Sequence, residues 1–402
     1  MSSQSPTVTT AAGAVRGVPH PHGAAFFGIP FAEAPVGDLR FAAPRRVTGW
    51  EGVRDALRPG PTPQRRPFGP VTTIPEPSFP GDATLNVNVF TPAAGDTAAG
   101  LPVLVWIHGG GFFAGSPSAP WYDGRSFARD GVVTVSVSYR LGFDGFGWID
   151  GAPLNRGVLD MIAALEWVQE NIRAFGGDPS RVTIAGQSAG GAAVLTLLTS
   201  PRTAGLFQAA ISESGPMPGV RPDVAERGGR AFAAACGVSP DVAGWRTLGE
   251  DEILDRQPEF LNSATAPSPA STTDELIAAI GDADAEMGLL FSPVMDGDAV
   301  AADPRGALSS GHGAALPLLL GSTRDEFSFP SPIPEADVVA RLRAAGVGEE
   351  SLSGFLSDVA ATGSDRAHSR LVTSQLFRAA VLAVADERRT APGSTTSPGA
   401  PP

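Results

Sequence analysis

One pentapeptide restricts the fold of this chain more than any other feature. Residues 186–190, GQSAG, fit the pattern G-x-S-x-G; the β-branched run 181–186 ends at the motif, and an Ala/Leu-rich stretch typical of a helix follows. The glycines allow a tight strand-to-helix turn that strains the serine backbone and lifts its hydroxyl clear of the sheet. Because a serine hydroxyl is a poor nucleophile alone, we expect Ser188 to need a base from elsewhere in the chain.

A second glycine-rich segment, HGGGF at residues 108–112, follows the apolar run 101–107. Consecutive glycines let the main chain approach a ligand closely and turn successive N–H groups toward it. An oxyanion hole needs such donors where the negative oxygen of a tetrahedral intermediate forms. We expect an oxyanion loop here, the alternative being a turn without function, and we expect His108 within it to be structural.

Two adjacent carboxylates, Asp325 and Glu326, follow the apolar run 316–322. In hydrolases with a G-x-S-x-G turn the catalytic residues run serine, acid, histidine along the chain, and this pair lies downstream of Ser188. The acid of such a triad holds the imidazole in its reactive tautomer. Position alone favours a catalytic acid no more than a solvated turn.

The apolar runs also predict the fold class. Residues 101–107, 132–139, 181–186 and 316–322 are typical of buried strands, and apolar positions recur at helical steps between 158 and 172. Alternating strands and helices predict an α/β fold with a mostly parallel central sheet covered by helices on both faces. The chemistry is then expected in the loops after the strand ends. The Pro- and Gly-rich first hundred residues predict short antiparallel strands against that sheet.

Composition limits the partners of the chain. Its 402 residues carry 29 Lys and Arg against 42 Asp and Glu, a net charge of −13, which argues against nucleic acid or an anionic membrane. Cys236 is the only cysteine, so no intramolecular disulfide marks an oxidising compartment. The N-terminus lacks the pattern of a signal peptide, and no apolar run is long enough to span a membrane. We expect a cytoplasmic protein and leave its oligomeric state open.

In chain order, these motifs and the segments around them resemble the type B carboxylesterases, the family that includes bacterial para-nitrobenzyl esterases and the cholinesterases. The matching segments span nearly the whole chain: FFGIPFAEAPVGDLRF, LNVNVFTP, PVLVWIHGGGF, VSVSYRLG, NRGVLDMIAALEWVQENIRAFGGDPSRVTIAGQSAGG, SESG and GSTRDEF. The longest of them, residues 155–191, is far more specific than G-x-S-x-G alone. One departure is GDATLNV, where many members carry a cysteine shortly before LNV.

The resemblance implies an α/β-hydrolase fold and hydrolysis of a small-molecule ester through an acyl-enzyme, with no metal or organic cofactor. It favours Glu326 over Asp325 as the triad acid. The residues that it assigns to the site are the nucleophile Ser188, the oxyanion donors Gly110, Gly111 and Ala189, the acid Glu326 and, near the acid, Ser214.

The catalytic histidine of the family lies farther beyond the acid than this chain extends. Among the five histidines only His368 follows Glu326, in the stretch SDRAHSRLVTSQLFRAA. This stretch resembles a helical segment of the family rather than its catalytic loop. A lone histidine near a helix start is most often a surface residue or a cap, so we expect the base to be absent and His368 not to replace it.

The last fifteen residues, RRTAPGSTTSPGAPP, stand where the family continues into a strand. Read out of frame from within Gly393, the codons permit Val-Tyr-His-Phe-Ala-Trp-Arg-Ser-Pro, which fits that strand. We therefore expect one domain over residues 1–387 without the last strands and helices, a low-complexity, disordered tail over 388–402, and a frameshift as the cause. Resequencing the locus tests this; a reading frame ending at Pro402 with no shifted coding potential beyond it would contradict a sequencing error.

Two functions stay open. The first is a serine carboxylesterase of doubtful activity, because a triad without its base retains only the oxyanion hole and substrate binding. The second is a non-catalytic esterase-like protein, either a pseudoenzyme or a binding module of the adhesion type. The intact serine, glycines and acid favour the first, and the missing base favours the second. The motifs do not determine the acyl or alcohol preference.

Overall fold

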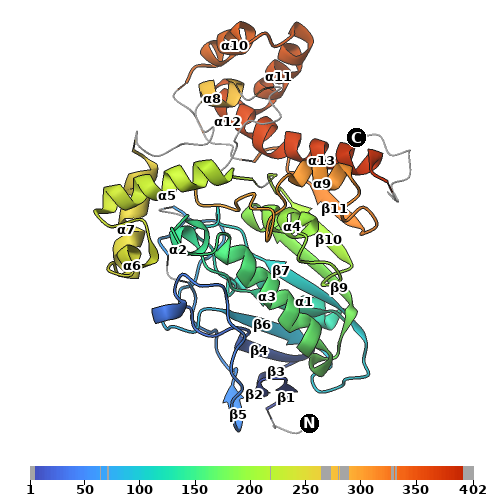
Figure 1. Ribbon diagram of the computed structural model, residues 1–402. Coiled ribbons are helices and arrows are strands. Elements are labelled where there is room, and N and C mark those ends of the chain that lie inside the picture. Colours follow the sequence, from blue (N-terminus) through green and yellow to red (C-terminus); the bar gives the residue numbers. More distant parts are fainter. Residues whose placement is uncertain are drawn as a thin grey trace.

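The computed structural model describes residues 5–63, 65–69, 72–217, 219–263, 273–278, 280, 289–326, 330 and 333–392 (Figure 1). The strands are β1 (Thr7–Thr10), β2 (Gly13–Arg16), β3 (Val18–His20), β4 (Gly23–Pro30), β5 (Val53–Asp55), β6 (Asn86–Thr91), β7 (Leu101–Ile107), β8 (Val133–Val137), β9 (Gly177–Gln187), β10 (Ala209–Glu213) and β11 (Leu318–Gly321). The helices are α1 (Arg125–Arg129), α2 (Gly142–Phe146), α3 (Arg156–Asn171), α4 (Ala189–Thr199), α5 (Pro222–Cys236), α6 (Val242–Trp245), α7 (Glu250–Leu261), α8 (Thr273–Ala278), α9 (Pro304–Ser309), α10 (Glu335–Ala344), α11 (Glu349–Thr362), α12 (Ala367–Val372) and α13 (Ala379–Thr390). Short 3₁₀ turns are η1 (Gly37–Leu39), η2 (Pro120–Tyr122), η3 (Ile172–Phe175) and η4 (Ser364–Arg366), and η5 (Thr373–Arg378) is a π-helix.

The central sheet has the strand order β11-β10-β9-β7-β8-β6-β4-β3. Neighbours from β11 to β8 are parallel, and β6, β4 and β3 continue the sheet in antiparallel fashion. The mostly parallel sheet is therefore confirmed. Antiparallel strands do form in the N-terminal part, but β3, β4 and β6 extend the central sheet instead of lying against it, and in a separate three-stranded sheet β1 and β2 are antiparallel while β2 and β5 are parallel. The four predicted strands correspond to β7, β8, β9 and β11. Strand β10 was missed, because its alanines and serine give a weak strand signal.

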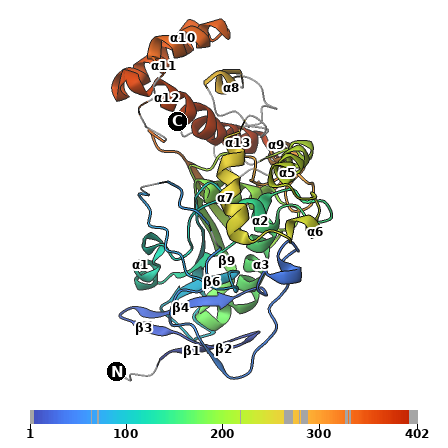
Figure 2. The ribbon, with the colours of Figure 1, turned by 90° about the vertical axis from the view of Figure 1, so that its left-hand side faces the viewer.

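Helices cover both faces of this sheet. Figure 2 shows α1 on one side of it and α3 on the other. The predicted helix is confirmed as α3, whose apolar positions are buried, and η3 and Gly176 (φ 83°) end it. A glycine is favoured there because an L side chain strains the left-handed conformation. Among the described residues, no helix is long and apolar enough to cross a membrane.

A buried ion pair joins the end of β8 to α3. The side chains of Arg140 and Asp160 are 4% and 0% exposed, and the guanidinium donates to the carboxylate from Nη2 (2.7 Å) and Nε (2.8 Å). Arg140 Nη1 also donates to the carbonyl oxygens of Arg40 and Ala42. Both charges are thus compensated, as burial in a low dielectric requires. The pair fixes the loop after β8 against the helix that leads to β9.

Apolar side chains form two separate buried clusters. The larger fills the space around the central sheet, and the smaller joins α8, α10, α11 and α12 in the upper part of Figure 1. Helix α13 packs back on the main body, where Arg388 donates to the carbonyl oxygens of Gly313 (2.7 Å) and Leu316 (2.6 Å). The boundary expected after residue 387 therefore falls inside α13. Residues 393–402 of the expected tail lie outside the described residues, and a single domain over 1–387 stays a prediction.

Strand β11 forms the edge of the sheet among the described residues, since it pairs with β10 alone. Leu318 and Leu320 pack against the larger cluster, whereas Leu319 between them is 66% exposed. An edge strand with an exposed apolar side chain presents unpaired backbone groups to other chains.

Replacing Leu319 with lysine is expected to reduce self-association, because a charge on an edge strand opposes pairing with another chain. Sedimentation velocity over a range of concentrations measures this. The matched control, Leu320→Lys, directs a charge toward the core and is expected to lower the unfolding midpoint instead. Equal self-association of the wild type and Leu319→Lys would show that this edge makes no intermolecular contacts.

Candidate active site

Ser188 lies at a sharp turn between β9 and α4. Its backbone has φ 58° and ψ −122°, a conformation that costs a non-glycine residue on the order of 1–3 kcal/mol. The Ser188 N–H donates to the Glu213 carbonyl at the end of β10 (2.8 Å), and the Ser188 carbonyl accepts from the Ala192 N–H in α4 (2.8 Å). The strained strand-to-helix turn predicted from the motif is confirmed.

Close packing requires both glycines of the motif. A Cβ on Gly186 would lie 2.5 Å from the Gly190 carbonyl carbon and 2.8 Å from the Ile107 oxygen. A Cβ on Gly190 would overlap that same oxygen and lie 3.0 Å from the His108 carbonyl carbon. The obstructing atoms are backbone and cannot rotate away. Strands β7 and β9 and helix α4 therefore reach this spacing only with glycine at both positions.

The Gly190→Ala protein is expected to lose about 2 kcal/mol or more of unfolding free energy, because overpacking costs about 1–3 kcal/mol and here involves backbone atoms. Urea unfolding measures the loss. In the control, Gly354→Ala on α11, the added methyl meets nothing within 4 Å, and alanine is the better helix former. A wild-type midpoint for Gly190→Ala would contradict the close approach.

The glycine segment after β7 lies directly beside Ser188. A Cβ on Gly109 would be 2.5 Å from the Gln187 carbonyl oxygen and 3.3 Å from the Ser188 Cβ. Gly110 and Gly111 have φ values of 117° and 61°, and the chain turns back through a hydrogen bond from the Ala114 N–H to the Gly110 carbonyl (2.8 Å). The structure thus brings the predicted oxyanion segment to Ser188.

The N–H groups of Gly110, Gly111 and Ala189 form no hydrogen bond with another described residue. Ala189 is the first residue of α4, and the helix dipole favours negative charge at that end. These are the properties that donors to a developing oxyanion need.

His108 is fully buried next to this segment. Its ring stacks on Tyr139 with centroids 4.5 Å apart, and its Nδ1 lies 2.8 Å from the Gly109 carbonyl oxygen, which makes Nδ1 the protonated nitrogen. The Tyr139 hydroxyl donates to the His108 carbonyl (2.8 Å). Burial lowers the pKa of His108 to about 4, and the charge of Arg65 adds to the decrease while the bond to Gly109 opposes it. This environment supports a structural role.

The low pKa of His108 predicts a stability loss in acid. Below pH 6.5 the unfolded chain binds a proton at this residue that the folded chain excludes until about pH 4. The unfolding free energy is therefore expected to fall by about 1.4 kcal/mol per pH unit across that window. Urea titrations from pH 4 to 7 should show that the unfolding free energy changes less steeply with pH in His108→Asn than in the wild type. The control is His22→Asn at an exposed position, and identical slopes for His108→Asn and the wild type would contradict the prediction.

Glu326 and Ser214 lie in contact. The Ser214 hydroxyl donates to Glu326 Oε1 (2.7 Å), and the Thr323 N–H donates to the same oxygen (2.8 Å). Ser214 has a strained φ of 51°, and its N–H donates to the Gly321 carbonyl (2.7 Å) at the end of β11. Since Glu213 next to it accepts from Ser188, the end of β10 connects the turn at Ser188 to residues 322–326 after β11, which we call the acid loop.

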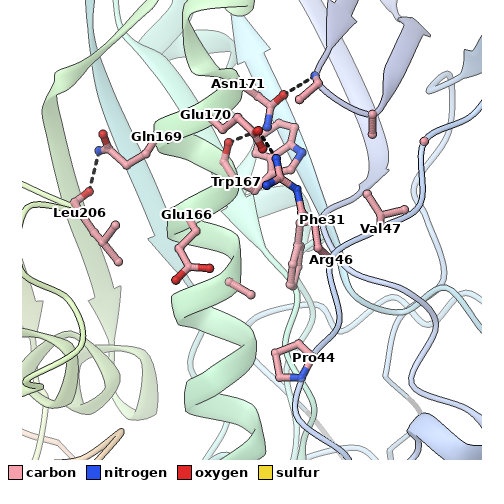
Figure 3. A pocket seen from close by; sticks show the side chains of 14 residues that line it. Phe31, Pro44, Arg46, Val47, Glu166, Trp167, Gln169, Glu170, Asn171 and Leu206 are labelled. Carbon is pink, nitrogen blue, oxygen red and sulfur yellow. Dashed lines mark hydrogen bonds and ion pairs between the residues drawn. The ribbon is translucent and has the colours of Figure 1, made fainter.

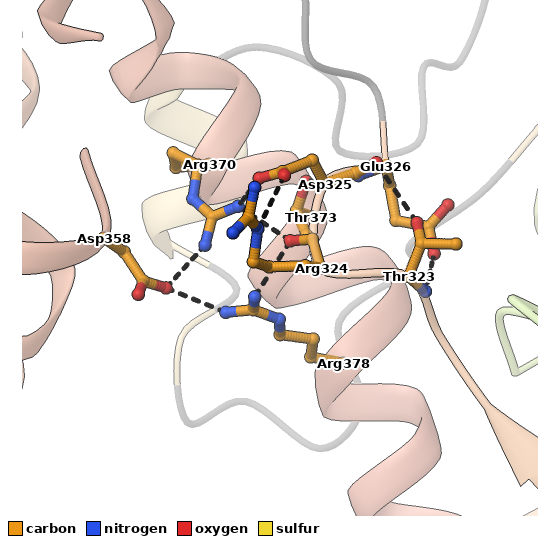
Figure 4. Close-up of polar contacts among 8 residues, drawn as sticks. All are labelled: Thr323, Arg324, Asp325, Glu326, Asp358, Arg370, Thr373 and Arg378. Atoms are coloured by element: carbon orange, nitrogen blue, oxygen red, sulfur yellow. Dashed lines mark hydrogen bonds and ion pairs between the residues drawn. The ribbon is translucent and has the colours of Figure 1, made fainter. Parts of the chain in front are cut away.

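Asp325 is engaged elsewhere, as Figure 4 shows. Its carboxylate pairs with Arg370 (2.5 Å) and Arg324 (2.9 Å). Arg370, whose side chain is 3% exposed, also pairs with Asp358 (2.5 Å). The described contacts of the Glu326 carboxylate are with a hydroxyl and an N–H instead, so the two neighbouring carboxylates differ in environment.

Helix α12 and the π-helix η5 hold this acid loop from behind (Figure 4). Arg370 and Arg378 donate to the Arg324 carbonyl (2.7 and 2.9 Å), and the Glu326 N–H donates to the Thr373 hydroxyl (3.3 Å). Thr373 and Arg378 are five residues apart and would diverge on an α-helix. A π-helix, with its i→i+5 bonds, places them on one side.

His368 lies on α12 but faces away from the acid. It precedes Arg370 by two residues, which is about 200° around an α-helix. The structure describes His368, Ser188 and Glu326, and no hydrogen bond joins the histidine to either of the other two. Burial lowers the pKa of His368. This placement supports the expectation that His368 is not the base.

Sequence reasoning missed a buried pair that supports the oxyanion segment. Glu76 Oε2 accepts from the Gly115 N–H (3.2 Å) and lies 3.7 Å from Nε of Arg65, whose side chain is 3% exposed. Both residues come from an irregular Pro-rich segment without periodicity, so no pattern marks them. In the part of the chain that the structure describes, no three histidine, cysteine or acidic side chains gather in a way that could hold a metal ion.

The parallel sheet, the serine turn after β9, the glycine segment after β7 and the acid loop after β11 together define an α/β-hydrolase. Solved structures agree. A PNB esterase gives a TM-score of 0.78 at 32% identity, covering 97% of this chain and 78% of its own. A Geobacillus stearothermophilus carboxylesterase gives a TM-score of 0.75 at 32% identity, and the match covers 95% of this chain and 76% of the esterase chain. The fold expected from the resemblance is confirmed.

The model of the carboxylesterase family matches residues 4–376, and the chain belongs to that family. It is 38% identical over 340 residues to the para-nitrobenzyl esterase of Bacillus subtilis (82% of this chain, 65% of that protein). It is 35% identical over 383 residues to the phenmedipham hydrolase of Pseudarthrobacter oxydans (91% of this chain, 72% of that protein). It is 36% identical over 344 residues to the acetylcholinesterase of Bungarus fasciatus (80% of this chain, 53% of that protein). The matches thus span about half to three quarters of the length of these relatives.

Proposed function

We propose that this chain is a serine carboxylesterase that hydrolyses small-molecule carboxylic esters through an acyl-enzyme on Ser188. The observation that carries the proposal is the turn at Ser188. The strained Ser188 lies beside a glycine segment whose Gly110 and Gly111 N–H groups donate no hydrogen bond to a described residue. Membership of the carboxylesterase family supports the reaction class. The relatives named para-nitrobenzyl esterase and phenmedipham hydrolase support it further.

In the proposed reaction the Ser188 Oγ attacks the ester carbonyl carbon, and the carbonyl oxygen becomes negative. The N–H groups of Gly110, Gly111 and Ala189 donate to that oxygen and stabilise the tetrahedral intermediate. The bond to the alcohol oxygen then breaks, and the alcohol leaves with a proton. Water attacks the acyl-serine in the second half of the reaction and releases the carboxylic acid.

Glu326 is proposed as the acid that orients an imidazole, with Ser214 and Thr323 fixing its carboxylate. None of the five histidines, all of which lie among the described residues, has a hydrogen bond to Ser188 or Glu326. Without a histidine the proton of Ser188 passes to water, so each acylation is slow. This observation favours the second candidate, a non-catalytic esterase-like protein, and makes the comparison with a serine-free variant decisive.

The 402-residue chain is expected to release p-nitrophenol from p-nitrophenyl acetate faster than its Ser188→Ala variant, because only the wild type can form an acyl-serine, whereas the variant keeps the oxyanion hole and substrate binding alone, worth roughly 10³–10⁴ over water in triad enzymes. Release of p-nitrophenol measures acylation, and the loss with time of the acetyl mass on Ser188 measures the attack of water in the second half. Ser310→Ala, at an exposed serine, is the control. Equal rates for the wild type and Ser188→Ala, without an adduct, would establish the non-catalytic alternative.

A cytoplasmic location is part of the same proposal. It is supported by the cysteine content, because the single Cys236 leaves no intramolecular disulfide that would mark an oxidising compartment. Fractionation of the native host with an antibody against the chain tests the location.

A further inference from the structure

A groove of about 540 Å³ lies between the N-terminal segments and the second half of α3 (Figure 3). Helix α3 leads through η3 into the start of β9, whereas Ser188 follows the end of β9. The groove therefore lies toward the opposite end of the sheet from the serine, and neither Ser188 nor the acid loop lines it. Its volume is in the range of sites for small molecules.

Apolar and polar side chains share the walls of the groove. Phe31 and Trp167 are almost fully buried, and four larger or central apolar side chains of the lining are half-buried. Those half-buried residues are Pro44, Val47, Ala163 and Leu206. An apolar group of a ligand can thus lose contact with water on several sides at once.

Polar groups at the groove are satisfied with one exception. Asn171 accepts from the Ala11 N–H (2.8 Å) and donates to the Trp167 carbonyl (2.9 Å). The Gln169 amide donates to two carbonyl oxygens. Arg46 pairs with Glu170. Glu166, which is exposed to solvent and stands across from Phe31 and Pro44 in Figure 3, has no hydrogen bond or ion pair with a described residue.

The charges that line the groove are Arg46, Glu166 and Glu170, so the lining carries one excess negative charge. The Arg46 side chain is 70% exposed and that of Glu170 39%, and exposed ion pairs of this kind contribute little. A ligand cation can therefore approach Glu166 without breaking a strong interaction. An anion would meet the unpaired carboxylate as a like charge.

We propose that this groove binds a small organic cation, namely a protonated primary amine that carries one aromatic or branched alkyl group. The ammonium donates to the Glu166 carboxylate, and the apolar group lies against Phe31, Trp167 and Leu206. A charge-assisted hydrogen bond beside an apolar surface gives preference for the cation over a neutral molecule of the same shape. The site is independent of the proposed esterase chemistry.

Titration calorimetry and ligand-observed NMR with phenethylammonium chloride test the proposal. The neutral 2-phenylethanol and the anionic 3-phenylpropionate are the matched ligands. The cation is expected to bind at least about tenfold more tightly than either, and Glu166→Gln is expected to weaken it by about tenfold. Glu259→Gln, an exposed substitution on α7 outside the groove, should leave binding unchanged.

A second variant, Ala163→Leu, places a larger side chain in the groove and is expected to weaken binding while the circular dichroism spectrum is retained. Three results would overturn the proposal: no binding of the cation at millimolar concentration, equal binding of 2-phenylethanol, or unchanged binding in Glu166→Gln. Because the readout is binding, an inactive Ser188 does not affect the outcome.

Discussion

Four backbone segments approach one another closely around Ser188, and the neighbouring strands and helix are arranged about this contact. Gly186 and Gly190 bring β9 and α4 against the end of β7, and a Cβ on Gly191 would lie 2.8 Å from the Glu213 carbonyl oxygen at the end of β10. Every residue of α4 is buried. The hydrophobic burial of this helix offsets the strain of the serine, and the parallel order of β7, β9 and β10 directs their carbonyl ends to the same place.

The main elements were predictable where the sequence pattern is local and strong. The runs that became β7, β8 and β9 are β-branched, and α3 shows a three- and four-residue apolar period. Strand β10 was not predictable in this way. Its position between β9 and β11 comes from pairing with both neighbours, which are distant in sequence. Such pairing overrides a weak intrinsic preference.

The candidate site likewise has parts that were predictable from the sequence and parts that were not. The serine turn and the glycine segment carry their own signals, because only glycine permits their backbone approach. The choice between Asp325 and Glu326 could not be made from position alone, since it depends on Arg370, which lies on a distant helix. The π-helix that aligns Thr373 with Arg378 has no sequence signature either. The family resemblance, rather than the local pattern, pointed to Glu326.

The position of the acid loop has a dynamic consequence. Ser188 directly precedes α4, whose apolar side chains belong to the larger buried cluster, but the loop of Glu326 is held by Arg370, whose other partner, Asp358, lies on a helix of the smaller cluster. Small clusters with few buried contacts open at lower free energies than a whole domain unfolds. Amide hydrogens around Glu326 are therefore expected to exchange through a local opening that leaves those of α4 protected. The two halves of the site then belong to different cooperative units, and the acid can be lost from the serine without unfolding of the sheet.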